Sequence, residues 1–129
     1  MDRMEYTRQL RASTDVHYNC CQSVLLPFAE EMGMTKDQLY SLGEFFNHGM
    51  RHGSVCGAVS GAMMVLGALG RDEKEAAALL RRFQEKHGAT DCAALLKSSH
   101  DRGEPRKPHC DGLVYEMVTA LDEIIQSQS

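Results

Sequence analysis

The sequence predicts an all-α fold, a compact bundle of six to seven helices that forms a single domain over residues 1–129. Apolar residues recur at helical spacing along most of the chain, no segment alternates as a strand does, and helix-capping residues precede several apolar runs. The length of 129 residues suits one hydrophobic core. A hydrophobic share of 43% and a charged share of 25% are ordinary for a globular protein.

The first two helices are expected before residue 34, and Gly33 is the expected stop of the second. A short helix covers residues 2–13, with its apolar side chains on one side. Asn19 and Gln22 have the spacing of a capping box, so a second helix is expected to start at Cys20. Pro27 lies inside its apolar run and should kink the helix or end it early, because proline lacks the N–H that the helix needs.

The middle of the chain is expected to form two more helices. Thr35 and Gln38 make a second capping box, which opens a helix that fades at residues 48–49. Ser54 is the expected N-cap of a buried helix over residues 55–69. That apolar run is shorter than the roughly 20 residues that cross a bilayer, so no membrane span is expected.

The remaining helices are expected over residues 73–86, 92–96 and 108–126. Asp72 caps the first of these and Gly88 stops it, and Thr90 or Asp91 caps the second. Pro108 fits the first position of the last helix, where its missing N–H costs nothing. Residues 98–107 are expected to form a polar loop.

The charge pattern narrows the choice of partners and compartment. The formal net charge is -4 and no basic block is present, which argues against binding nucleic acid or an anionic membrane. The first residues are charged and lack the apolar core of a signal peptide, so a cytoplasmic location is expected. Structural disulfides are uncommon in a reducing cytosol. The five cysteines are therefore expected to be buried thiols, metal ligands or redox groups.

Four cysteines fall at predicted helix starts: Cys20, Cys56, Cys92 and Cys110. The first turn of a helix has free N–H groups and the positive end of the helix dipole, which favour a thiolate over a thiol. Cys56 is the expected low-pKa thiolate and Cys20 its partner in a reversible disulfide. Cys92 and Cys110 would make a second pair that passes electrons on. The alternative that most of these cysteines are simply small buried residues stays open.

Glycines at a spacing of four residues mark the predicted buried helix. Gly53, Gly57 and Gly61 would form one stripe along it, with Ala58 beside them. Each interior glycine costs about 1 kcal/mol of helix stability relative to alanine, so the stripe indicates a packing or binding role. Tight helix packing is one interpretation. Close approach of Gly57, Ala58 and Gly61 to a bound cofactor or other group beside Cys56 is the other, and the two are compatible.

Two histidines lie near cysteines in the sequence. His52 precedes Cys56 by four residues, and His109 is next to Cys110. Either one is able to deprotonate a thiol or to join it on a metal, and solvated loop histidines are the alternative reading. Asp111, on the other side of Cys110, should disfavour a thiolate there.

Two segments carry a resemblance to a known family. The segments NCCQSVL (19–25) and GSVCGAVSG (53–61), followed by two single cysteines, resemble the C_GCAxxG_C_C family from about residue 19 to 126. The resemblance implies a small bacterial or archaeal protein with four signature cysteines, to which redox activity is ascribed without an established reaction. The signature residues carried over are Cys20, Cys56, Gly57, Ala58, Gly61, Cys92 and Cys110. Cys21 stands where the family commonly has a small residue. The resemblance therefore implies that Cys21 is the extra cysteine. Helix geometry adds only that one of the two neighbours should face a site, because they point about 100° apart.

Three functions remain open from the sequence. The leading one is a thiol-based redox protein that exchanges disulfides or electrons with a partner protein or a small thiol; as an enzyme it would be a thiol–disulfide oxidoreductase and would need no cofactor. The second is a protein that holds zinc or an iron–sulfur cluster on its four signature cysteines, although no CxxC pair is present. The third is a non-catalytic helical interaction module. Homo-oligomers are compatible with all three.

Overall fold

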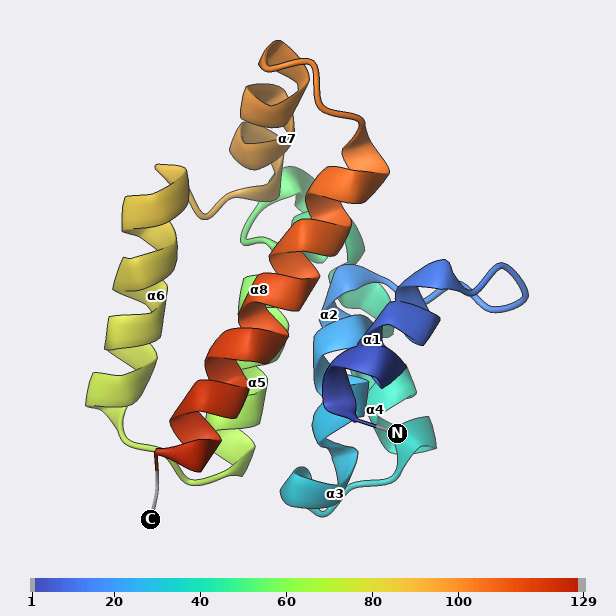
Figure 1. Cartoon of the computed structure of the whole chain (residues 1–129), viewed down its shortest axis with the longest axis vertical. Helices are drawn as coiled ribbons and strands as arrows, with labels where there is room; N and C mark the ends of the chain where they lie inside the picture. Colours follow the sequence, from blue (N-terminus) through green and yellow to red (C-terminus); the bar gives the residue numbers. More distant parts are fainter. Residues whose placement is uncertain (1, 128–129) are drawn as a thin grey trace.

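The computed structural model describes residues 2–127 and consists there of eight α-helices joined by turns (Figure 1). In chain order these are α1 (Arg3–Ala12), α2 (Cys20–Leu25), α3 (Ala29–Met32), α4 (Lys36–Leu42), α5 (Gly57–Ala68), α6 (Glu73–His87), α7 (Cys92–Asp101) and α8 (Arg106–Gln126). The prediction of an all-α fold is confirmed. None of the described helices has both the length and the apolar character needed to cross a membrane.

The first capping box forms as predicted and positions the start of α2. The N–H of Gln22 donates to the Asn19 side chain at 2.8 Å, and the N–H of Asn19 donates to the Gln22 side chain at 2.9 Å. Pro27 breaks the helix, because Leu26–Phe28 form a single 3-10 turn before α3. This break adds the eighth helix. Gly33 then ends α3 in the left-handed conformation, as expected.

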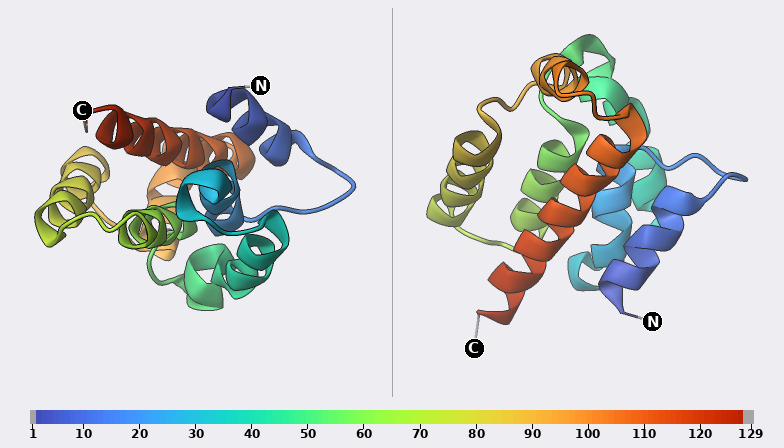
Figure 2. Two further views of the ribbon diagram at one scale, coloured as in Figure 1. Left: turned by 90° about the horizontal axis from the view of Figure 1, so that it is seen from below. Right: turned by 45° about the horizontal axis from the view of Figure 1, so that its top comes forward.

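Helices α2 and α5 lie side by side in the middle of the molecule, and α8 packs against both (Figures 1 and 2). A Cβ atom added to Gly61 would lie 3.0 Å from the carbonyl oxygen of Cys21, and one on Gly57 would lie 3.1 Å from the Cys21 nitrogen. The backbone that comes close to these glycines is therefore that of α2. Ala58, between them, is fully buried. The packing interpretation of the stripe is confirmed at Gly57 and Gly61, and α2 fills the space at Gly61 that a bound group would need.

Helix α5 begins later than predicted, at Gly57. Ser54 is not its cap: the carbonyl of Ser54 accepts from the N–H of Cys92 at 2.6 Å, and its own N–H donates to Gly49 at 2.9 Å. The N-cap is Cys56, whose backbone is extended. Gly53 lies before the helix with φ 74°, so its predicted place in the glycine stripe is wrong. The hydrogen bond between Ser54 and Cys92 joins the segment before α5 to the start of α7 instead.

The helix that follows the second capping box is shorter than predicted. Thr35 and Gln38 cap it as expected, yet α4 ends at Leu42 instead of at residues 48–49. A 3-10 turn over Glu44–Phe46 comes next, and residues 48–51 then all have φ between 51° and 60°. Left-handed conformations cost non-glycine residues roughly 1–2 kcal/mol each, so the surrounding contacts must hold this segment in place. Strained segments of this kind often lie at functional sites.

The C-terminal helices are longer than predicted at the ends that face each other. Helix α7 continues past residue 96 to Asp101, and α8 begins at Arg106 with Pro105 as its cap, two residues before Pro108. The predicted loop over residues 98–107 shrinks to residues 102–105. Two serines of that segment lie at the end of α7, and their hydroxyls make hydrogen bonds to nearby charged side chains. Arg102 donates to Ser98 at 2.7 Å, and Ser99 donates to Glu104 at 3.1 Å. The cap Asp72 of α6 and its stop Gly88 are as predicted.

Candidate functional site

The four signature cysteines come from four different helices and meet at one end of the bundle. They line a small cavity of about 40 Å³ together with His48 and Arg106. Cys20 is the first residue of α2, Cys56 caps α5, Cys92 is the first residue of α7 and Cys110 lies on α8. Cys21 is fully buried in the core instead. The adjacent pair is thus divided between the site and the core, as expected on a helix.

Cys110 is the one signature cysteine that lies outside a first turn or cap. Because α8 begins at Arg106, Cys110 is its fifth residue. The helix dipole acts mainly within the first turn, so it contributes little at Cys110. The prediction that all four cysteines lie at helix starts is therefore wrong for Cys110, and any activation of this thiol must come from neighbouring side chains.

The surroundings of Cys56 disfavour the low-pKa thiolate that the sequence predicts there. Burial raises the pKa of the Cys56 thiol to about 11, although the backbone N–H groups of Ala58 and Val59 act in the opposite direction. Only 4% of this residue is exposed. Burial and the nearby charge of Cys110 also raise the pKa of Cys92. At these two positions, the free-energy cost of desolvating a thiolate exceeds the stabilisation that the helix start gives it.

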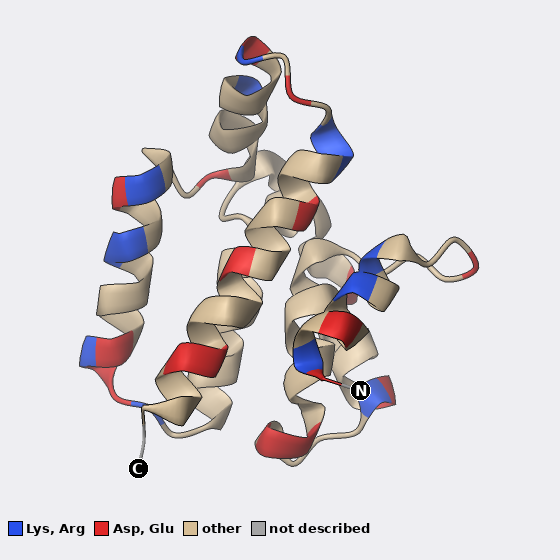
Figure 3. Ribbon diagram, viewed as in Figure 1, with Lys and Arg blue, Asp and Glu red and all other residues tan. Residues whose placement is uncertain are grey.

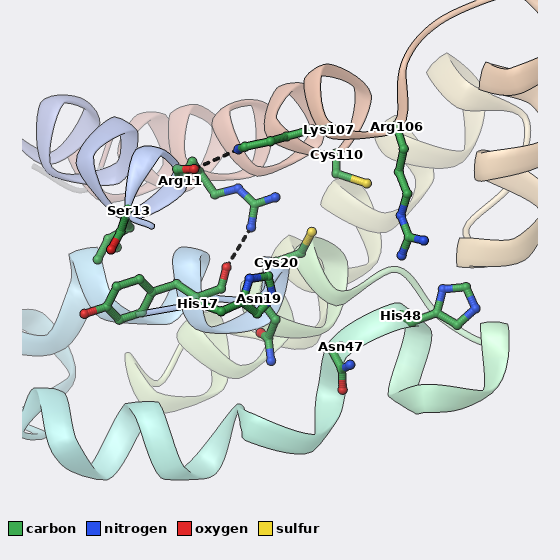
Figure 4. Close-up of a pocket in the computed structure, with 12 residues that line it drawn as sticks. Arg11, Ser13, His17, Asn19, Cys20, Asn47, His48, Arg106, Lys107 and Cys110 are labelled. Carbon is green, nitrogen blue, oxygen red and sulfur yellow. Dashed lines mark hydrogen bonds between the residues drawn. The ribbon is translucent and has the colours of Figure 1, made fainter. Parts of the chain in front are cut away.

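The sulfurs of Cys110 and Cys20 point toward each other from α8 and α2 (Figure 4). A hydrogen bond from the Cys20 thiol lowers the pKa of Cys110 to about 6; burial opposes this, and the charges of Arg106 and Arg11 reinforce it. The same hydrogen bond, followed by burial, raises the pKa of Cys20 well above its ordinary value. Within the pair, the surroundings therefore favour the thiolate on Cys110 and the thiol on Cys20.

Arg106 is a site residue that the sequence analysis missed. It precedes Cys110 by four residues, which places both on one face of α8. Its guanidinium lies near the Cys110 sulfur and lowers the pKa of that thiol. The spacing was visible in the sequence, but residues 98–107 were expected to be a loop, where such a spacing carries no meaning.

Arg11 reaches the same site from α1 and also corrects the prediction for Asp111. Its Nε donates to Asp111 Oδ1 at 2.7 Å, and Lys107 Nζ lies 3.0 Å from Asp111 Oδ2. Two cations thus neutralise the carboxylate, so Asp111 does not prevent a thiolate on Cys110. Arg11 is almost a hundred residues away in the chain, and no local signal points to it.

The histidines that lie near the signature cysteines differ from those predicted. His52 is exposed and is not among the described residues that line the cavity. His109 does line it; among the described residues its buried Nε2 has no hydrogen-bond partner, and its Nδ1 lies 3.5 Å from Glu104. His48, in the left-handed segment, places Nδ1 3.6 Å from Cys92 Sγ. The structure therefore associates His48 with the signature cysteines in place of His52.

A larger pocket of about 410 Å³ opens from solvent onto the same thiol pair. It lies between the C-terminal end of α1, the start of α2, residues 47–48 and the start of α8 (Figure 4). Cys20, Cys110, His48 and Arg106 line both this pocket and the small cavity. Cys56 and Cys92 line only the small cavity. A molecule entering from solvent thus reaches Cys20 and Cys110 first.

The donor groups are less suited to a metal ion than to a thiol pair. Over residues 2–127, no three His, Cys, Asp or Glu side chains are arranged to hold a metal ion. The four signature cysteines share a cavity, but the arrangement that zinc or an iron–sulfur cluster requires is not assembled from them. The geometry favours the pair of Cys20 and Cys110 over a four-cysteine metal site.

The thiolate on Cys110 predicts an unusual pH dependence of labelling. We expect alkylation of Cys110 by iodoacetamide to rise with a midpoint near pH 6, since its pKa is lowered to about 6. Cys56, with a pKa of about 11, should react at least roughly 100-fold more slowly at neutral pH. Peptide mass spectrometry after timed labelling measures both rates. A midpoint for Cys110 above about pH 8, where ordinary thiols titrate, would contradict the assignment.

The same shift has a consequence for stability. The pKa of Cys110 is lower in the folded protein than the ordinary value of 9.0. Its thiolate therefore contributes stability that is fully present above about pH 9 and is lost as the pH falls through about 6.

A family model described as "Putative redox-active protein (C_GCAxxG_C_C)" matches residues 18–124. The match includes all four signature cysteines and the glycines of α5, and it agrees with the extent expected from the sequence segments. No curated protein and no solved structure matches the chain.

Proposed function

Because the chain belongs to the C_GCAxxG_C_C family, described as redox-active, we propose that it exchanges thiols and disulfides through Cys110 and Cys20. One observation carries this proposal: the sulfurs of Cys110 and Cys20 face each other in the lining of a pocket open to solvent, and the surroundings of Cys110 lower its pKa. Efficient exchange needs an accessible thiolate, a second thiol within reach and a weakly basic sulfur as nucleophile. Cys110 and Cys20 supply these features together.

In the proposed reaction, the reduced protein transfers two electrons to a disulfide. The Cys110 thiolate attacks one sulfur of the substrate; the substrate S–S bond breaks, a mixed disulfide forms and one half leaves as a thiolate. Cys20 then loses its proton and attacks the Cys110 sulfur. The mixed disulfide breaks, a Cys20–Cys110 disulfide forms, and the second half leaves and takes up the proton. A reducing thiol reverses the sequence and restores the dithiol.

This pairing differs from the one expected from the sequence. Cys56 was the expected nucleophile, but it lies behind the pair and its raised pKa keeps it protonated at neutral pH. Cys92 shares the inner cavity and contacts His48. We assign the first exchange to Cys110 and Cys20, with Cys56 and Cys92 as inner thiols that small reagents meet later.

Disulfide mapping tests the assignment. We expect one equivalent of a small disulfide, added to the reduced protein without oxygen, to give an internal Cys20–Cys110 disulfide while Cys21 stays reduced. Non-reducing digestion and peptide mass spectrometry identify the linked residues. A first disulfide that contains Cys56, or a protein that forms no internal disulfide, would overturn the assignment.

A further inference from the structure

The pocket that leads to Cys110 has a positive lining. Three cationic side chains line it, Arg11, Arg106 and Lys107, together with His17 and His48. No aspartate or glutamate is among the described residues of this lining. Lys and Arg colour the C-terminal part of α1 and the start of α8, where the pocket opens (Figure 3). The whole chain has a net charge of -4, so the charge of this pocket is opposite in sign to that of the chain.

The cations differ in how far the protein itself neutralises them. Arg11 and Lys107 share the carboxylate of Asp111 and are held by it. Arg106 makes no ion pair with any carboxylate of residues 2–127, and its side chain extends toward His48 across the pocket (Figure 4). Three positive charges thus face two negative ones, the Asp111 carboxylate and the Cys110 thiolate. The uncompensated charge lies on the side where Arg106 meets the solvent.

The size of the pocket limits what enters it. A volume of about 410 Å³ lies in the usual range for small-molecule sites, roughly 300–1,000 Å³. The thiol pair lies at its base, below side chains of α1 and α8, and not on a flat surface. A small molecule fits this arrangement better than a folded protein.

We propose that the substrate is a small disulfide that carries an anionic group such as a carboxylate, which Arg106 binds while a substrate sulfur meets Cys110. This inference rests on the proposed exchange function and names its substrate class. Binding the anion gives a carboxylate partner to Arg106, which has none among residues 2–127, and directs the disulfide to the sulfur four residues further along α8. A substrate with ammonium groups meets repulsion from the same side chains.

Three small disulfides of similar size and different charge test the inference. They are dithiodipropionate with two carboxylates, cystamine with two ammonium groups, and the neutral bis(2-hydroxyethyl) disulfide. The rate of each with the reduced protein is divided by its rate with free N-acetylcysteine amide, a thiol without other charged groups, which removes differences in leaving group. We expect the protein to prefer the anionic over the cationic disulfide by roughly tenfold, and less at high salt.

Two variants identify the residue responsible. Arg106→Gln should lower the preference by about fivefold or more. A ratio of two rates on one protein cancels any change in the thiolate fraction of Cys110. Lys97→Gln removes the same charge from α7, where the side chain is 81% exposed and lies outside the pocket. This control should keep the full preference.

The outcomes separate the two proposals. If Cys110 reacts fast with all three disulfides without a charge preference, or if Arg106→Gln keeps the preference, the anionic substrate class is wrong and the exchange function stands. If Cys110 reacts no faster than N-acetylcysteine amide with any of them, the exchange function is wrong and the substrate class falls with it.

Discussion

Replacing Cys110 by serine should slow thiol–disulfide exchange at neutral pH by at least about 100-fold. The reason is the distribution of charge among the thiols. The pKa of Cys110 is lowered to about 6, so this sulfur is mostly thiolate at pH 7, whereas burial raises the pKa of Cys56 to about 11. Release of the coloured thiolate from an aromatic disulfide, followed by stopped-flow absorbance, measures the rate.

The variant Cys20→Ser separates the two roles of the pair. A serine hydroxyl still donates a hydrogen bond to the Cys110 thiolate, so the first attack should proceed at a rate close to that of the native protein. The second attack is lost, and the mixed disulfide should accumulate on Cys110 as a stable mass increase. Cys21→Ala is the matched control at the neighbouring core position and should turn over normally. Equal loss of rate in Cys56→Ser and Cys110→Ser would contradict the assignment.

Substituting Gly61 by alanine should destabilise the fold by about 1–3 kcal/mol. The added Cβ would lie 3.0 Å from the carbonyl oxygen of Cys21 and 3.1 Å from the Cβ of Val24. Both atoms belong to α2, which cannot shift without disturbing the segment that carries Cys20. The loss should exceed the gain of about 1 kcal/mol that alanine normally brings to a helix interior. Urea unfolding followed by circular dichroism gives the free energy of unfolding.

Gly67 provides the control on the same helix. It is exposed on α5, and a Cβ added there meets no atom within 4 Å. Gly67→Ala should therefore stabilise the protein by about 0.5–1 kcal/mol. The two variants make the same chemical change on the same helix with opposite expected signs. A stabilised Gly61→Ala would show that α2 and α5 are not in the tight contact described here.

Features set by neighbours in the chain were predictable. Both capping boxes, the break at Pro27 and the stop at Gly33 depend on hydrogen bonds and dihedral angles within about four residues. The predictions that failed involve distant partners. Ser54 would cap a helix in isolation, but in the fold its carbonyl is taken by the N–H of Cys92.

The candidate site shows the same division. The glycine stripe predicted a close backbone neighbour, and two of its three members meet α2. The order and spacing of the cysteines predicted the family, and the family model matches over nearly the same residues. The low pKa expected for Cys56 was argued from helix starts alone and left out burial, which raises the pKa of that thiol.

The sequence by itself determined the helical fold, most helix boundaries, the signature cysteines and the family to which the chain belongs. Caps, turns and apolar spacing depend on residues within about one helical turn of each other, so they can be predicted from the sequence. Only the tertiary structure decided the surroundings that set the pKa of each thiol. Burial of Cys56 beneath α2, the approach of Cys20 to Cys110, and the guanidinium of Arg11 arriving from α1 join parts of the chain far apart in sequence. A thiol pKa follows from the solvent and charges around the sulfur, and folding alone assembles that environment.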